Sequence, residues 1–110
     1  MNIDEAMERA RSLRRKYEVL ETRRYGRPWT IEEIALGFVG DVGDLAKLIQ
    51  ASAGVREFAG AEGALAHELA DCLWSILILA DKLDVDIEQA FRSTIEDLTR
   101  SIDAELGGGD

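Results

Sequence analysis

The sequence has few proline, cysteine, histidine and aromatic residues. Its 110 residues include one proline, one cysteine and one histidine, and only 6% of them are aromatic. A single cysteine cannot form an internal disulfide, which excludes the disulfide framework of small secreted domains. The scarcity of proline, together with 46% hydrophobic and 32% charged residues, favours a helical bundle.

Positive charge is also scarce, since 13 Lys and Arg face 22 Asp and Glu, for a net charge of −9. A chain of this charge repels polyanions, so we expect no nucleic-acid partner and no anionic membrane partner. Residues 1–4 lack the basic and apolar regions with which a signal peptide begins. The lone cysteine, inside an apolar segment, agrees with a reducing compartment, and we expect a cytoplasmic protein.

One long apolar segment is present, at residues 67–83. It holds no Gly or Pro and is predicted to be a helix. Because apolar side chains surround it after its first turn, we expect it to be buried on every side. The run is too short, and its Asp and Lys too close, for a membrane span. A 110-residue chain has little room to cover such a helix alone, so we expect a second copy to complete the core.

Three further helices are predicted by capping pairs, in which a polar residue precedes a helix and Glu or Gln follows three residues later. The pairs are Asn2 with Glu5, Thr30 with Glu33, and Asp86 with Gln89. We therefore expect an all-α, four-helix fold as a single domain over residues 1–106. The longest loop is expected at residues 51–63, and a flexible tail at residues 107–110.

The inward faces of these helices are predicted from apolar residues at helical spacing. They are Ile3, Met7, Ala10, Leu13, Tyr17 and Leu20 in the first helix, Ile31, Ile34, Ala35, Phe38, Val42, Leu45, Ala46 and Ile49 in the second, and Ile87, Ala90, Phe91, Ile95, Leu98 and Ile102 in the last. The first helix also carries a basic run: Arg9, Arg11, Arg14, Arg15 and Lys16. We interpret this run as a solvated face that touches a ligand only if the helix borders the acidic residues described next.

Two pairs of acids, Asp41 with Asp44 and Glu68 with Asp71, each lie one helical turn apart. If their helices pack antiparallel, the four carboxylates converge, and each pair at ~5 Å repels by about 3 kcal/mol at an effective dielectric near 20. Lys47 is the one nearby cation. Oxygen ligands alone predict Mg²⁺, or Mn²⁺, rather than zinc. The alternative is that these acids face solvent on amphipathic helices, and spacing alone does not separate the two.

A di-iron carboxylate bundle is excluded, because it needs Glu-x-x-His on two helices. The single histidine, His67, is preceded three residues earlier by Ala64. Three glycines inside the second helix, Gly37, Gly40 and Gly43, each cost about 1 kcal/mol relative to Ala. We expect them to permit close approach of another helix or of a ligand.

The stretch DVGDLAKLI, followed after a loop by HELADCLWSILILADKLDVDIEQA, resembles the MazG-like all-α nucleoside triphosphate pyrophosphohydrolases. The resemblance covers roughly residues 30–90. It implies a four-helix MazG-like bundle, and the apolar helix in so short a chain predicts that the bundle is completed by homo-oligomerisation, as a homodimer or homotetramer. The resemblance also implies that Asp41, Asp44, Glu68 and Asp71 hold Mg²⁺, with Glu68 and Asp71 as the strongest catalytic candidates. Water would attack between the α and β phosphates, releasing nucleoside monophosphate and pyrophosphate, an activity that can serve house-cleaning of the nucleotide pool.

Two departures from the family pattern bear on this hypothesis. Asp41 and Asp44 stand where the family usually has Glu, so each ligand is shorter by roughly one carbon–carbon bond. Thr94 and Leu98 stand where the family tends to have a phosphate-contacting Lys and Asn, and Arg92 is a candidate substitute. The alternative function is a catalytically degraded relative that binds nucleotide or metal, or an oligomeric interaction module.

Candidate substrate contacts are Lys47, Trp29, Trp74 and Arg92. Each tryptophan has two interpretations, a packing residue at a helix or a surface on which a base stacks. Lys47 pairs with Asp44 or reaches a phosphate, and the sequence does not rank these two. The sequence also leaves open which base and sugar are accepted.

Overall fold

The computed structural model describes residues 1–53 and 61–107, and all its regular elements in these ranges are helices. They are α1 (Ile3–Tyr25), α2 (Ile31–Ser52), α3 (Ala61–Lys82) and α4 (Ile87–Gly107). The prediction of an all-α chain with four helices is confirmed.

The predicted caps begin three of the helices. The Asn2 side chain accepts a hydrogen bond from the Glu5 backbone N–H at 2.9 Å. Thr30 and Glu33 form both bonds of a capping box before α2, and the Asp86 side chain accepts from the Gln89 N–H at 3.1 Å. Such caps satisfy N–H groups that a helix start leaves without partners.

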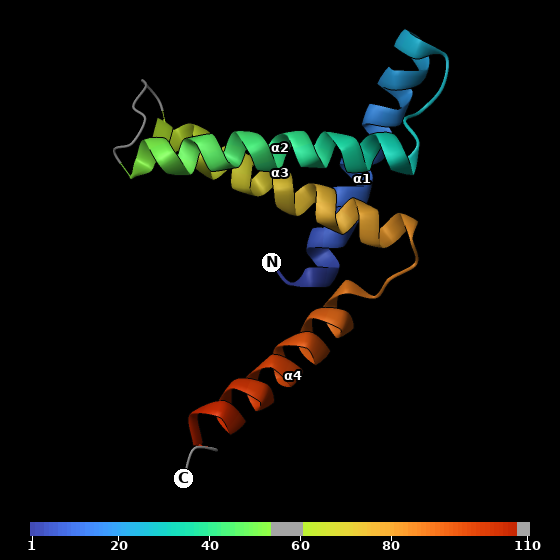
Figure 1. Ribbon diagram of the computed structural model, residues 1–110. Helices are drawn as coiled ribbons and strands as arrows, with labels where there is room; N and C mark the ends of the chain where they lie inside the picture. The colour runs from blue at the N-terminus through green and yellow to red at the C-terminus, as the bar shows by residue number, and fades with distance from the viewer. Residues whose placement is uncertain (54–60, 108–110) are drawn as a thin grey trace.

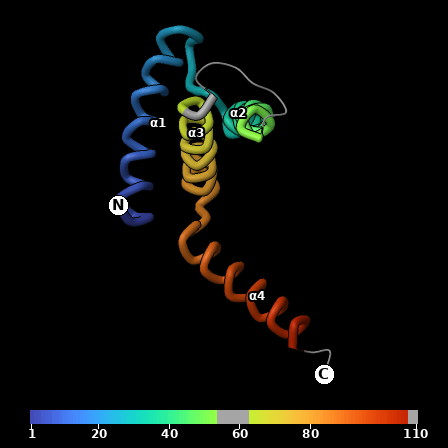
Figure 2. The backbone as a smooth tube through the Cα atoms, turned by 90° about the vertical axis from the view of Figure 1, so that its left-hand side faces the viewer, coloured from blue at the N-terminus to red at the C-terminus, as the bar shows by residue number. Residues whose placement is uncertain are grey.

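Helix α3 lies between α1 and α2 (Figure 2). α2 and α3 run antiparallel along each other, and α1 crosses them at a steep angle (Figure 1). Two ion pairs join α1 to the end of α3: Arg11 Nε lies 2.7 Å from Asp81 Oδ1, and Lys82 Nζ lies 3.7 Å from Glu18 Oε1. The antiparallel arrangement expected for the two acidic helices is therefore present.

The core lies where α1, α2 and α3 meet. Its centre is Ile78, which is 2% exposed. The buried residues of this cluster are Met7, Ala10, Ile34, Leu77, Ile78 and Ala80, with Ala6, Trp74, Leu79 and Ile87 packed against it. Since α3 supplies half of the buried residues, the apolar segment at residues 67–83 is central to the fold, as the sequence predicts.

The expected loop at residues 51–63 is too long at both ends. α2 continues to Ser52, and α3 already begins at Ala61, six residues before His67. Residues 54–60 lie outside the described part of the chain. Of the expected tail, Gly107 is the last residue of α4, and residues 108–110 lie outside the described part.

The inward face of α1 also differs from the prediction. Met7 and Ala10 are buried as expected, but the face continues through Arg14 and Glu21, and Leu13 is 44% exposed. Arg14 is thus no member of a solvated basic face. A charged residue can take an inward position here because Glu21, on the same face two turns later, forms an ion pair with it.

The inward face of α2 is shifted in its second half. Leu48 and Ala51 are buried there, whereas the predicted Val42 and Ile49 are 44% and 52% exposed. Ile34 is buried as expected. The apolar residues of this helix occupy more than one face, so spacing alone could not select the one that meets α3.

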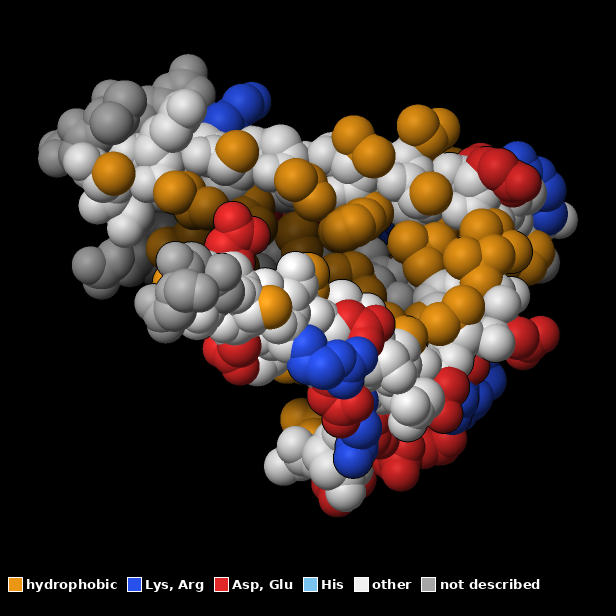
Figure 3. Space-filling view, turned by 60° about the horizontal axis from the view of Figure 1, so that its bottom comes forward, with side chains coloured by type: hydrophobic (Ala, Val, Ile, Leu, Met, Phe, Trp, Pro, Cys, Tyr) orange, Lys and Arg blue, Asp and Glu red, His pale blue; other side chains and the backbone are white. Residues whose placement is uncertain are grey.

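Helix α3 is not buried on every side in one protomer, since Leu69 and Leu73 are 52% and 54% exposed. α4 projects away from the other three helices (Figure 1), and its apolar stripe stays exposed. That stripe comprises Phe91, Ile95, Leu98, Ile102 and Leu106. Figure 3 shows hydrophobic side chains spread over a hollowed face of the molecule. One protomer therefore leaves much of its predicted apolar surface uncovered.

By length and composition, the segment Gly63–Lys82 of α3 could cross a membrane, so the expectation that the apolar run is too short for a span is wrong: the helix begins before His67. In this fold the same segment packs against α1 and α2 and supplies core residues. Its apolar composition therefore has an explanation in helix packing.

The expectation of close approach along the α2 glycines is wrong for two of them within the protomer. A Cβ built at Gly40 or Gly43 meets no atom of the described residues within 4 Å outside its own helix and chain neighbours. At Gly37 a Cβ would lie 3.8 Å from Trp29 Cζ3, an ordinary contact. The shorter Asp41 and Asp44 side chains therefore reach α3 without a glycine contact between the helices.

We therefore predict that Gly40→Ala stabilises the free protomer by about 1 kcal/mol, because Ala is the better helix former and its methyl group meets open space. Urea unfolding at low protein concentration measures this change. A loss of stability would contradict the prediction and would mean that another copy of the chain packs on this face.

Candidate functional site

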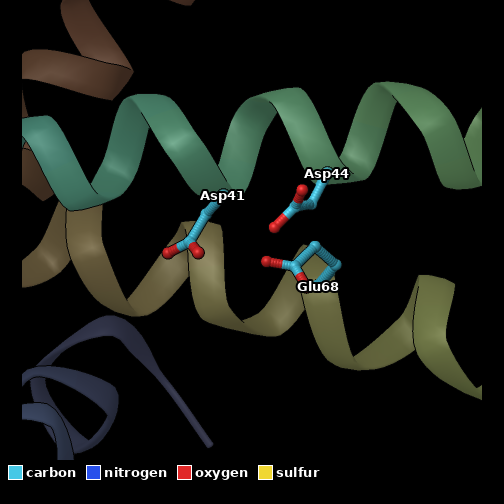
Figure 4. Close-up of side chains that lie close together, drawn as sticks. All are labelled: Asp41, Asp44 and Glu68. Atoms are coloured by element: carbon cyan, nitrogen blue, oxygen red, sulfur yellow. The ribbon is translucent and has the colours of Figure 1, made fainter.

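Three carboxylates from two helices converge between α2 and α3. Asp41 and Asp44 lie on α2 and Glu68 on α3, and their side chains point toward one another (Figure 4). One carboxylate oxygen from each residue lies within 4.8 Å of those of the other two. The i, i+3 spacing places both aspartates on the face that α3 contacts, and the antiparallel packing brings Glu68 opposite them.

The environment of these acids favours the protonated form of Glu68. Its pKa is raised, first because packing removes water from the carboxyl, and then because Asp41, Asp71 and Asp44 add negative charge nearby. Cys72, one turn along α3, is buried, and its thiol pKa is raised for the same two reasons. The raised pKa favours the protonated thiol, which is a poor nucleophile.

Asp71 lies beside the three-carboxylate cluster rather than within it. Its Oδ2 is 3.3 Å from His67 Nε2, on the same helix one turn earlier. Its charge still acts on Glu68. The structure thus brings together three of the four predicted metal ligands and places the fourth at the edge, next to the single histidine.

The donor set of the cluster fits a hard divalent cation. All three groups are carboxylates, and Mg²⁺ and Mn²⁺ prefer oxygen ligands. Asp44 is exposed and Asp41 half-buried, so solvent reaches the cluster and would supply further oxygen ligands to a bound cation. Among the described residues no Lys or Arg forms an ion pair with any of the three.

A cavity of about 420 Å³ adjoins the cluster. Asp41, Asp71 and His67 line one part of it, and Glu21, Leu20 and Gly37 also contribute to its wall, together with four aromatic residues and two arginines. The aromatic residues and arginines are Tyr17, Tyr25, Trp29, Trp74, Arg14 and Arg24. A smaller cavity of about 90 Å³ shares Arg14, Trp29, Gly37, Asp41 and Trp74 with it and adds Phe38, Ser75 and two isoleucines.

Both predicted tryptophans border these cavities. The Trp74 indole N–H donates to the Ala10 carbonyl oxygen at 3.1 Å, and its ring lies 5.5 Å from that of Tyr17. Trp74 is therefore a packing residue that also forms part of the cavity wall. Trp29 is 41% exposed, and its backbone N–H donates to Glu21 Oε1 at 2.9 Å.

Besides the hydrogen bond from the Trp29 N–H to Glu21, a second set of contacts holds the loop that carries Trp29. Arg27 Nη1 lies 2.6 Å from Glu33 Oε1, and the Thr30 N–H donates to the same oxygen at 2.9 Å. The Arg27 guanidinium, and then the Thr30 N–H, lower the pKa of Glu33 to about 2. Glu33 therefore stays ionised and keeps the loop attached to the start of α2.

Arg14 is the cavity residue that sequence reasoning missed. It is 6% exposed, its Nη2 donates to Glu21 Oε1, and its Nε is buried without a hydrogen-bond partner among the described residues. One signal could have identified it: Glu18 and Glu21 follow four and seven residues later, on the same face of α1.

The other two predicted substrate contacts lie away from the cavities that Asp41 lines. Lys47 is exposed on α2, and no ion pair joins it to Asp44 in the described part of the chain. Arg92 lies on the projecting α4, where its Nη2 is 3.4 Å from Glu88 Oε1. Thr94 and Leu98 are exposed on the same helix.

The family of the chain follows from a match to a known domain. Residues 27–104, most of the sequence, match the MazG nucleotide pyrophosphohydrolase domain. The chain belongs to this family. No curated protein and no solved structure gives a significant match.

The MazG match covers α2, α3 and most of α4, and it includes the carboxylate cluster. It begins after α1, so Arg14 and Glu21 lie outside it. The cavity beside the cluster therefore has two sources. The segment that matches the MazG domain supplies Asp41, Asp71 and both tryptophans, and α1 supplies another part of the wall.

We predict that Asp44→Asn lowers the pKa of Glu68, because it removes one of the negative charges that raise it. When the pKa of a carboxyl is higher in the folded than in the unfolded state, the protein becomes less stable as pH rises through these two pKa values. At neutral pH and without metal, the variant should therefore be more stable, by about 1 kcal/mol once solvent screening of the exposed Asp44 is allowed for.

NMR titration of Glu68 and thermal unfolding in EDTA measure the two effects. Asp103→Asn, an exposed substitution on α4, is the control. Titration and unfolding curves of Asp44→Asn that match those of wild type would show that Asp44 is a solvated surface residue.

Proposed function

We propose that the protein is a Mg²⁺-dependent nucleoside triphosphate pyrophosphohydrolase, which converts an NTP or dNTP and water into the monophosphate and pyrophosphate. The observation that carries the proposal is the convergence of Asp41, Asp44 and Glu68 within 4.8 Å beside a cavity with aromatic walls, in a chain of the MazG family. Mn²⁺ is the alternative ion.

The negative charge of the carboxylate cluster supports a triphosphate that binds together with a divalent cation as substrate. Three carboxylates would repel phosphate oxygens, so a divalent cation has to lie between them. When bound, Mg²⁺ supplies neutralisation of phosphate charge and lowers the pKa of water. Asp41, Asp44 and Glu68 would hold the ion, and Glu68 and Asp71 are the carboxylates that we assign to the reaction centre.

The proposed contacts to the base and to the phosphates lie in different parts of the cavity. Trp29 and Trp74 offer faces on which a base can stack, since both border the cavity that Asp41 also lines. Asp71, 3.3 Å from His67, is placed to accept a proton close to the cluster. The triphosphate would thus lie at the acidic end and the nucleoside between the aromatic walls.

We predict that Glu68→Gln and Asp71→Asn each lower kcat for pyrophosphate release by at least about a hundredfold, as loss of a group acting on the reacting atoms does. Pyrophosphate and orthophosphate are measured separately over a panel of triphosphates with Mg²⁺ or Mn²⁺. Glu32→Gln, an exposed acid on α2 outside the cavities, should retain wild-type rates.

Release of pyrophosphate from no triphosphate in the panel would refute the enzyme assignment. Thermal stabilisation of the wild type by nucleotide and metal, without turnover, would identify a binding module instead. Neither stabilisation nor turnover would indicate an interaction protein.

We also propose that the active species is a homodimer or homotetramer in the cytoplasm, with neither nucleic acid nor membrane as a partner. The apolar stripe of α4 and the exposed leucines of α3 are the support, because a single protomer leaves both uncovered. Two copies whose α4 helices pack on each other's exposed faces would bury them.

We predict that Ile102→Glu, on the apolar stripe of α4, shifts sedimentation toward monomer, because a charge would be buried at the contact. Ala104→Glu adds the same group to the far side of the helix and should leave the assembly intact. A wild-type protein that sediments as a folded monomer at micromolar concentration would contradict the proposal.

A further inference from the structure

A buried guanidinium forms part of the cavity wall beside the carboxylate cluster. Arg14 lines both the larger and the smaller cavity, next to Trp29, Trp74 and Asp41. It is 6% exposed, and among the described residues its one hydrogen bond runs from Nη2 to Glu21. An arginine has five N–H donors, so most of this donor capacity is unused.

The ion pair decides what kind of group Arg14 can bind. Its partner Glu21 is buried too, at 5% exposure, and Glu18 Oε1 lies 4.0 Å from Nε. The positive charge is therefore already neutralised within the protein, which leaves little attraction for a phosphate. The unused N–H groups can still donate to a neutral oxygen, and a guanidinium has no acceptor to offer an amino group.

The surroundings of Arg14 point to the same kind of ligand. Trp29, Phe38, Trp74 and Ile78 make the smaller cavity mostly apolar. Of the three carboxylates that would hold a cation, Asp41 lines this cavity, and Asp44 and Glu68 do not. A flat, uncharged ring with a polar edge fits such a site better than a charged chain of phosphates.

We propose that Arg14, fixed by Glu21, donates a hydrogen bond to a carbonyl oxygen of the nucleobase and thereby selects the substrate. The proposal rests on the proposed function, since it assumes that the triphosphate binds at the carboxylate cluster. With the phosphates there, the base edge farthest from the sugar extends toward Arg14. A base with a carbonyl on that edge is accepted, and a base with an amino group there leaves the buried donors without a partner.

Glu21 acts as a positioning residue in this arrangement. Its Oε1 accepts hydrogen bonds from both Arg14 Nη2 and the Trp29 backbone N–H. One carboxylate oxygen thus fixes the donor and one aromatic wall relative to each other. Base selection by Arg14 and base stacking by Trp29 are therefore coupled through Glu21.

Two matched pairs of substrates test the selection. dITP and dATP differ at C6 of the purine, and dUTP and dCTP differ at C4 of the pyrimidine, with carbonyl in the first of each pair and amino in the second. For the wild type we expect kcat/KM to favour the carbonyl member by about tenfold or more, the size of discrimination that one good base contact gives. The difference should appear mainly in KM.

The test variant is Arg14→Gln combined with Glu21→Gln. Breaking a buried ion pair by changing one partner is strongly destabilising, so both are changed, and the amide oxygen introduced by Glu21→Gln still accepts from the Trp29 N–H. An amide both donates and accepts, so the carbonyl preference should fall at least about fivefold. Arg15→Gln, at the exposed neighbouring position, should keep the wild-type preference.

A second measurement does not depend on turnover. Binding of dIMP, dAMP, dUMP and dCMP without metal, followed by calorimetry, should show the same preference in the wild type. Arg14→Lys, which retains a charge for Glu21, replaces the double variant if that fails to fold, and should reduce the preference because its donor is shorter and no longer planar.

The outcomes separate the selection from the reaction. Pyrophosphate release by the wild type with equal kcat/KM within both pairs would overturn the selection and leave the proposed function standing. An equal loss for all four triphosphates in the double variant would assign Arg14 to a phosphate and overturn it as well. No pyrophosphate release by the wild type, and no monophosphate binding, would overturn both proposals.

Discussion

The packing of α3 between α1 and α2 is the constraint on which both parts of the site depend. One face of α3 presents Glu68 to the aspartates of α2, and the adjoining face presents Trp74 to Ala10 on α1. A shift of α3 by one turn, about 5.4 Å, would separate Glu68 from Asp41. The same shift would remove Trp74 from the cavity wall. The carboxylate cluster and the aromatic cavity wall, the proposed metal and base ends of the site, are therefore positioned by one helix.

The carboxylate cluster is held together against its own repulsion. Burial, and then the charges of Asp41, Asp71 and Asp44, raise the pKa of Glu68. Among the described residues no Lys or Arg forms an ion pair with Asp41, Asp44 or Glu68. The core at Ile78 and the ion pair of Arg11 with Asp81 stabilise α3 from the other side. The stability lost at the cluster is thus offset by apolar packing and by contacts to α1, which is common at functional sites.

The helix starts and the acid pairs could be predicted from the sequence, because each depends on residues within one turn of helix. Thr30 and Glu33 form the capping box that the spacing indicates, and the antiparallel packing of α2 on α3 brings the acids together as expected. The resemblance carried by Glu68, Asp71 and their apolar neighbours indicates the family. These signals suffice because a cap or an i, i+3 pair is decided within one turn of helix.

The parts that depend on distant partners could not be predicted. The sequence places Arg14 on a solvated face, because a basic run on an amphipathic helix is usually exposed. Its burial depends on Glu21, two turns away, and on a loop that returns Trp29 to the same carboxylate. The expectation that another helix approaches the α2 glycines is wrong within the protomer at Gly40 and Gly43, because the face of α2 that meets α3 depends on the packing of both helices and not on α2 alone.

The two parts of the cavity need not change together in evolution or in the laboratory. The carboxylate cluster lies in the segment that matches the MazG domain, whereas Arg14 and Glu21 lie on α1, before the match begins. Residues that hold a cation are constrained by ligand number and geometry. A donor that contacts one edge of a base is constrained only by that edge. If the proposed base contact of Arg14 is right, substitutions on α1 would change which nucleotide is bound while the acids of the MazG segment stay in place.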